Sequence, residues 1–248
     1  MDFNAGKLSH IFALLILILG ILFIFVLPIV TFFILLDSPQ LLESIDVSEV
    51  SAIASQLLVI AVFILVPFAW YFIVNKSGLK GIFTRIKLVS KNIDKAFLWG
   101  ILVAIVIFFA IFVIEYVLIS LGYEPQDLSN IPELQRLFSW PSMFFLVAIQ
   151  PIGEEIFFRG FLFEKIENYA GGTAAVYITA FLFGIAHMSY GKIFPVLMPM
   201  LMGIIFGYIV LKTKNLYSSL VAHIVFNVTV LILAYLGWEL IKETALIL

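Results

Sequence analysis

The stretch from Gln150 to Gly160 reads Gln-Pro-Ile-Gly-Glu-Glu-Ile-Phe-Phe-Arg-Gly and places two carboxylates and one guanidinium inside an apolar segment. An ionised side chain at the centre of a bilayer costs roughly 2.5–3.5 kcal/mol on insertion scales, so such residues usually serve a function. On a helix, Glu155 and Arg159 are four residues apart and share a face, which predicts that they pair. Glu154 points about 100° away from Glu155. We therefore expect Glu154 to be free for chemistry; a purely structural ion cluster is the alternative.

Two histidines lie in the apolar segments that follow. His187 comes four residues after Phe183, and His223 precedes Asn227 by four residues in the last long apolar segment. This spacing puts the side chains of His223 and Asn227 on one face of a helix. Two histidines, an asparagine and the carboxylate pair in three apolar segments predict one intramembrane site.

These residue types suit hydrolysis by water. A carboxylate in a poorly solvated cavity can act as a general base, and a nearby histidine can hold the same water, here Glu154 and His187. Paired donors such as His223 and Asn227 suit the oxyanion that develops during peptide-bond hydrolysis. The sequence has no cysteine and neither a G-x-S-x-G nor an H-E-x-x-H pattern, so attack by activated water is what remains. Zinc held by Glu154, His187 and His223 stays open as an alternative.

Composition sets the class of protein. The chain of 248 residues is 63% apolar and 12% charged, whereas soluble domains are about a quarter charged. It is therefore an integral membrane protein with the lipid bilayer as a partner. The peptide-bond hydrolysis inferred above adds a membrane-bound peptide or protein substrate as the second expected partner. The net charge of −2 gives no basic surface, which argues against nucleic acid. No P-loop occurs, so ATP-driven transport has no support, and we expect no cofactor.

Seven apolar segments predict transmembrane helices, because backbone groups in lipid must find partners within the segment. Most approach or exceed the ~20 residues needed to cross, but the fifth and sixth are short. A further short helix could lie in Val47–Ser55 or Trp238–Leu248. The predicted fold is an all-α polytopic membrane bundle of about seven to eight helices around an intramembrane catalytic cavity. The segments are Ile11–Leu36, Ala52–Val74, Ala96–Leu121, Trp140–Phe163, Thr173–Met188, Phe194–Leu211 and Leu216–Leu236.

The chain divides into N-terminal helices and loops (1–139), a catalytic core (140–236) and a short C-terminal tail (237–248). Lysines and arginines gather in the Asn75–Lys95 loop, and acidic residues gather in the Asp37–Glu49 loop. The positive-inside rule therefore predicts a cytoplasmic N-terminus. We expect the Asn75–Lys95 loop to be an ordinary cytoplasmic loop. The alternative is an amphipathic segment with five apolar residues toward the bilayer, namely Leu79, Ile82, Phe83, Ile86 and Val89.

Three motifs occur in order between Trp140 and Leu236, and together they resemble those of a known family. They are Glu154-Glu155-x-x-x-Arg159, Phe183-x-x-x-His187 and His223-x-x-x-Asn227. They are similar to the motifs of the CPBP family, which holds the CAAX prenyl protease 2 enzymes and the bacteriocin-processing or Abi-type membrane proteins.

The resemblance implies an intramembrane glutamic endopeptidase without a catalytic metal. It implies that Glu154 and His187 activate water, that His223 and Asn227 form the oxyanion hole, and that Glu155 and Arg159 support them. Eukaryotic members cleave after a prenylated cysteine. The short chain without soluble domains looks prokaryotic, which suggests a plasma-membrane location and substrates of CAAX, bacteriocin or signal-peptide type. A non-catalytic scaffold or self-immunity protein, and a proton-coupled transporter, are the alternative functions.

Overall fold

The computed structural model describes residues 3–38, 40, 47–122, 135, 137–188 and 194–245, and every regular element in these ranges is a helix. The all-α prediction is therefore confirmed for the described chain. The elements, with η for a π-helix, are α1 (Leu8–Ile21), η1 (Leu22–Val26), α2 (Leu27–Asp37), α4 (Glu49–Ile73), α5 (Leu79–Arg85), α6 (Ile93–Ser120), α8 (Trp140–Glu155), η2 (Ile156–Leu162), α9 (Phe163–Ala170), α10 (Gly172–Ile185), α11 (Phe194–Thr213) and α12 (Tyr217–Ala245).

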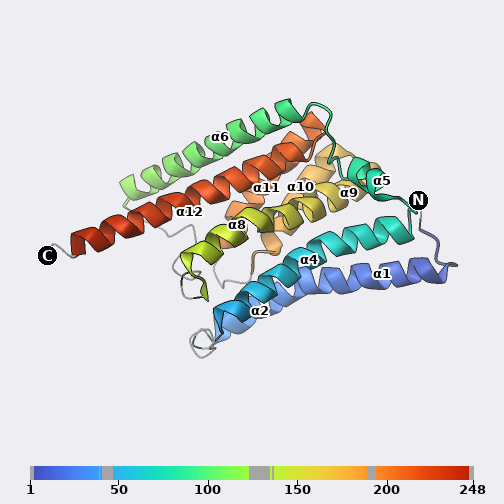
Figure 1. Cartoon of the computed structure of the whole chain (residues 1–248), viewed down its shortest axis with the longest axis horizontal. Coiled ribbons are helices and arrows are strands. Elements are labelled where there is room, and N and C mark those ends of the chain that lie inside the picture. The colour runs from blue at the N-terminus through green and yellow to red at the C-terminus, as the bar shows by residue number, and fades with distance from the viewer. Residues whose placement is uncertain are drawn as a thin grey trace.

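The long helices run side by side along the molecule, with the two chain ends at opposite ends of it (Figure 1). Helices α6 and α12 pack together at one edge, and α1 packs against α4 at the other. Helix α8 lies between these pairs and contacts both α4 and α12. The helix that carries the acidic pair is thus placed at the centre of the bundle.

Five helices of the described chain are long and apolar enough to cross a membrane. This confirms an integral membrane protein with several spans. They are Leu8–Asp37, Glu49–Ile73, Ile93–Ile114, Val196–Thr213 and Tyr217–Gly237. The remaining two predicted spans fall on α8 with η2, and on the shorter α10 of 14 residues. A count of seven or eight spans stays a prediction.

Three helix boundaries differ from the sequence-based expectation. Helix α4 begins at Glu49, so most of Val47–Ser55 is the start of a span and not a separate helix. The helix of the fourth predicted span does not stop at Phe163 but runs on through α9 to Ala170. Helix α12 runs to Ala245 instead of stopping at Leu236, because the sequence Glu-Leu-Ile-Lys-Glu-Thr-Ala favours helix. The described residues expected as a tail or an extra helix, up to Ala245, therefore continue helix α12.

Small residues bring the central helices into close contact. A Cβ added at Gly153 of α8 would lie 3.2 Å from Cβ of Phe63 on α4. A Cβ added at Gly203 of α11 would lie only 2.9 Å from the Cα of Ala180 on α10. Without a side chain at these positions the backbones approach each other, as is common between membrane helices.

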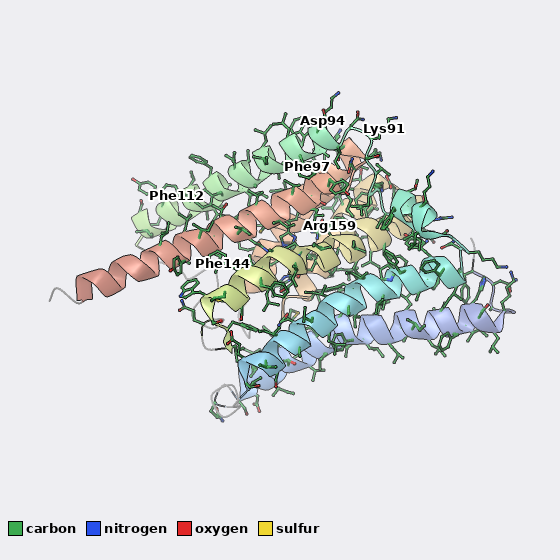
Figure 2. The ribbon with its side chains drawn as sticks, in the orientation of Figure 1. Lys91, Asp94, Phe97, Phe112, Phe144 and Arg159 are labelled. Atoms are coloured by element: carbon green, nitrogen blue, oxygen red, sulfur yellow. The ribbon has the colours of Figure 1, made fainter. Side chains whose placement is uncertain are left out.

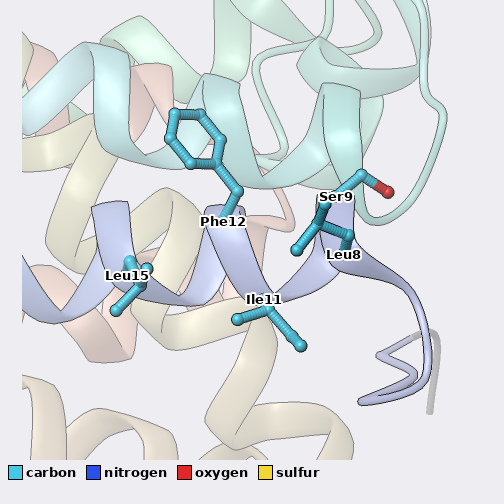
Figure 3. Close-up of a pocket in the computed structure, with 5 residues that line it drawn as sticks. All are labelled: Leu8, Ser9, Ile11, Phe12 and Leu15. Carbon is cyan, nitrogen blue, oxygen red and sulfur yellow. The ribbon is translucent and has the colours of Figure 1, made fainter.

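The outward faces of the helices are apolar. Phe109 and Phe112 of α6 are 64% and 60% exposed, and Figure 2 shows Phe112 on the outer side of that helix. On α1, a shallow apolar groove is lined by Leu8, Ser9, Ile11, Phe12 and Leu15 (Figure 3). None of the predicted site residues lines this groove. Such surfaces are suited to contact with lipid chains. Because lipid offers polar groups no hydrogen-bond partner, the polar side chains gather inside the bundle.

The Asn75–Lys95 loop does not turn its five apolar residues toward the bilayer as the amphipathic alternative required, and its cytoplasmic location stays a prediction. It contains the short helix α5, of which Ile82 is fully buried, and Ile86 just after α5 is also fully buried. Both belong to the core cluster that includes Phe158 and Leu216. Leu79 is 56% exposed. The apolar residues are therefore divided between the protein core and the surface, and the loop is docked onto the bundle.

Candidate active site

The two carboxylates sit at the end of α8 and are shielded from solvent. Glu154 is 4% exposed, and Glu155 and Arg159 are fully buried. Nη1 of Arg159 donates to Oε1 of Glu155 at 3.0 Å, so the predicted pair is confirmed. The charge on Glu155 is thus compensated within one turn of helix, in the interior where an unpaired charge would be most costly.

Glu154 has a different set of partners. Its Oε1 accepts a hydrogen bond of 2.8 Å from Nε2 of Gln150, one turn earlier on α8. Its Oε2 lies 3.7 Å from Nε2 of His223. Arg159 is bonded to Glu155 and not to Glu154, so Glu154 faces the histidine without a hydrogen bond from the guanidinium. Gln150 was not among the predicted site residues, although its i, i+4 spacing from Glu154 could have indicated it.

His223 joins α12 to the end of α8. Its Nδ1 lies 3.1 Å from Oε1 of Glu155, which is 68 positions away in the chain. An ionised carboxylate only accepts hydrogen bonds, so Nδ1 carries the hydrogen. The other ring nitrogen faces Glu154 at 3.7 Å. The imidazole is therefore placed between the two carboxylates, with one nitrogen toward each.

His187 lies just after the end of α10 and is partly buried. Its Nδ1 is 2.7 Å from the carbonyl oxygen of Phe183. A carbonyl only accepts, so this bond puts the hydrogen on Nδ1 and leaves Nε2 of the neutral ring as an acceptor. Both His187 and Glu154 are in the described chain, and no hydrogen bond or ion pair joins them. Phe183 packs against both histidines: its ring centre lies 4.7 Å from the ring centre of His187 and 5.8 Å from that of His223.

Asn227 lies one turn after His223 on α12, as the spacing predicts, and is half-buried. Among the described residues its amide has no hydrogen-bond partner. The amide is thus available to a ligand, on the same helix as His223.

Aromatic rings surround the guanidinium of Arg159, which Figure 2 shows in the middle of the bundle. Its Cζ lies 4.1 Å from the ring centre of Phe183 and 5.4 Å from that of Phe206. Within the part of the chain that the structure describes, its Nε and Nη2 atoms have no hydrogen-bond partner, so the ring faces supply their electrostatic environment. Gly203 makes the space, since an added Cβ there would lie 3.1 Å from Nη2. Sequence reasoning missed Phe206 and Gly203, because nothing in their own segment distinguishes them.

The zinc alternative requires three ligands at one point. Within the described ranges, no group of three or more histidine, aspartate or glutamate side chains converges as a metal-binding group. Glu154 and His223 approach each other, whereas His187 is turned to the carbonyl of Phe183 by its Nδ1 hydrogen bond. What the arrangement offers is a shielded carboxylate, a histidine acceptor and two donors from one helix.

Comparison with known proteins gives one result. Residues 136–229 match the family model Rce1-like, described as type II CAAX prenyl endopeptidase Rce1-like. No curated protein matches the chain, and no solved structure matches it. All six residues predicted for the site lie within the matched segment.

Proposed function

We propose, since residues 136–229 match the Rce1-like family of membrane proteases, that the chain is an intramembrane glutamic endopeptidase. It hydrolyses a peptide bond in a membrane-associated peptide or protein. The observation that carries this proposal is the state of Glu154: it is 4% exposed, it is not paired with Arg159, and it faces His223. A buried carboxylate that makes no ion pair with an arginine or lysine of the described chain is suited to accept a proton.

In the first chemical step, a water molecule between Glu154 and His187 loses a proton to the Glu154 carboxylate. The oxygen forms a bond to the substrate carbonyl carbon, and the carbonyl becomes a tetrahedral oxyanion. His187 orients the water through Nε2, which the Nδ1 bond to Phe183 leaves as an acceptor. Collapse of the intermediate breaks the carbon–nitrogen bond, and Glu154 returns its proton to the leaving amine.

His223 and Asn227 hold the oxyanion during this step. Nδ1–H of His223 is directed at Glu155, so only a proton on Nε2 allows the ring to donate to substrate. Glu155 and Arg159 therefore support the site by holding His223 in a donating orientation.

The substrate class follows from the family. A prenylated peptide of CAAX type is the first candidate, because the matching family is described by that activity. A bacteriocin-like or signal-peptide-like segment is the second, since it too presents a peptide bond at the membrane surface. In both cases the apolar part of the substrate lies in the bilayer and brings the scissile bond to Glu154.

The test uses the full chain reconstituted in liposomes with three internally quenched peptides. One carries a farnesylated CAAX sequence, one is the same peptide without the lipid, and one resembles a signal peptide. We expect cleavage of a membrane-anchored peptide by the wild type, none by Glu154→Gln, and unchanged rates in strong chelator. A chelator-sensitive rate restored by zinc would make Glu154, His187 and His223 ligands instead. A second comparison uses cells that lack the gene and receive either the wild type or Glu154→Gln. If neither purified protein cleaves any peptide and both restore the phenotype that the cells lost, the chain is a scaffold or self-immunity protein.

A further inference from the structure

The segment from Ile86 to Lys91, which follows α5, contacts the turn of helix that carries Arg159. Ile86 is fully buried, and a Cβ added at Gly160 would lie 2.9 Å from the Cβ of Ile86. Gly160 follows Arg159 directly in η2. A glycine at this position lets Ile86 sit against the backbone, so the segment is packed tightly on one side of the site.

The other side of the same segment is bonded to the start of α12 through Asn215, which is 1% exposed. Nδ2 of Asn215 donates to the carbonyl oxygens of Val89 and Lys91, each at 3.0 Å. Its Oδ1 accepts from the backbone N–H of Tyr217 at 3.0 Å and so caps the first turn of α12. Both amide hydrogens and the amide oxygen are therefore used, two of them to hold the segment and one to hold the helix.

Further contacts hold the place where the Ile86–Lys91 segment meets α9 and the start of α12, called the junction below. The backbone N–H of Leu216 donates to the carbonyl oxygen of Lys87 at 2.8 Å. The ammonium groups of Lys87 and Lys214 lie 2.6 and 2.9 Å from the carboxylate oxygens of Glu167 on α9. Both lysines have left-handed backbone, with φ of 60° and 53°. Left-handed backbone is unfavourable for a lysine and persists where the surrounding contacts determine the conformation.

The segment thus connects η2 with α12, the two elements that carry the guanidinium and the oxyanion donors. Asn215 precedes His223 by eight residues, about 12 Å along the helix. We propose that Asn215 is a positioning residue, which fixes α12 along its axis against α8 and η2. That axial position places His223 at 3.1 Å from Glu155 and 3.7 Å from Glu154. The inference rests on the proposed protease function for its effect on rate, but the position of α12 is measurable without it.

The experiment compares two variants between the end of α11 and the start of α12. Asn215→Asp keeps the oxygen that caps Tyr217 but removes both donors to Val89 and Lys91 and places a negative charge opposite their carbonyls. Thr213→Val removes a hydroxyl that bonds Ile209, Ser218 and the backbone of Asn215, and it leaves the side-chain bonds from Asn215 to the segment in place. We expect Asn215→Asp to lower kcat per folded enzyme about 10- to 100-fold with KM within twofold, as a displacement of about 1 Å does. Thr213→Val keeps wild-type kcat.

The position of α12 is read by double electron–electron resonance. Spin labels are placed at Leu58 of α4 and Leu233 of α12, which are 56% and 47% exposed and lie on helices that both pack against α8. The chain has no cysteine of its own, so only these positions are labelled. We expect a shifted or broadened distance in Asn215→Asp and an unchanged one in Thr213→Val. An unchanged distance in Asn215→Asp, or the same loss of kcat in both variants, overturns the proposal. If the wild type cleaves no peptide, the protease assignment fails. The distance between the labels at positions 58 and 233 then decides by itself whether Asn215 positions α12.

Discussion

Nδ1 of His223 lies 3.1 Å from Oε1 of Glu155, the same oxygen that accepts from Arg159 at 3.0 Å. One carboxylate oxygen therefore joins a residue of α12 to the α8–η2 helix in the interior of a membrane protein. Glu155 therefore holds Arg159 and His223 in place, whereas Glu154 next to it accepts only from Gln150 among the described residues. The predictions below separate these two roles.

Replacing the base removes the reaction. Glu154→Gln keeps the size of the side chain but cannot accept a proton, so we expect activity to fall to background. Glu155→Gln is the matched control, since it changes the neighbouring carboxylate in the same way. The measurement is kcat in liposomes, with thermal unfolding as a check on folding. An active Glu154→Gln enzyme beside an inactive, well-folded Glu155→Gln enzyme would assign the base to Glu155.

Removing one oxyanion donor leaves a slow enzyme. Asn227→Ala deletes an amide that has no hydrogen-bond partner among the described residues, so the fold should tolerate the change. We expect kcat to fall about 10²–10³-fold, the usual loss for one such donor, with a rate still above that of Glu154→Gln. Single-turnover rates on the cleaved peptide measure this. A wild-type rate in Asn227→Ala would exclude the residue from the oxyanion site.

The buried ion pair controls stability. Glu155→Gln leaves Arg159 charged and fully buried without its partner, which typically costs about 3–5 kcal/mol. The double variant Glu155→Gln/Arg159→Met removes both charges, and we expect its thermal midpoint to lie nearer to wild type than that of Glu155→Gln. Lys214→Ala breaks a more exposed pair, worth about 0–1 kcal/mol, and serves as the control. A double variant less stable than the single one would contradict this account.

Acid should weaken the junction around Glu167. Partial burial raises the pKa of Glu167, but the hydrogen bonds from Lys87 and Lys214 outweigh it, so the pKa lies below the ordinary value of 4.5. A carboxyl with a lowered folded-state pKa stabilises the fold above its unfolded-state pKa, and this contribution is lost as pH falls through the folded-state value. We expect the stability difference between wild type and Glu167→Gln to be largest above pH 4.5 and to shrink below it. A constant difference would show that Glu167 acts without its charge.

The orientation in the membrane is tested by labelling in intact cells. The positive-inside rule places the Asn75–Lys95 loop in the cytoplasm and the Asp37–Glu49 loop outside. Ser48→Cys should therefore react with an impermeant thiol reagent, and Ser77→Cys should react only after the cells are opened. Labelling of position 77 and not of position 48 would reverse the topology.

The sequence by itself determined what depends on local geometry. The pairing of Glu155 with Arg159 and the shared face of His223 and Asn227 follow from helical spacing, because residues four apart meet on one side of any α-helix. The membrane class follows in the same way from apolar length. Boundaries were less certain: α12 extends to Ala245 because good helix formers continue past the apolar run.

Only the tertiary structure decided how these pieces meet. That Nδ1 of His223 bonds Glu155, that Phe183 and Phe206 enclose Arg159, and that Asn215 holds Val89 and Lys91 depend on the packing of helices far apart in the chain. No local pattern encodes such contacts, because they are set by which helix faces fit together once every backbone group is satisfied within its own helix. The sequence therefore indicated which carboxylate pairs with Arg159, and helix packing set which residues of the other helices contact the two carboxylates.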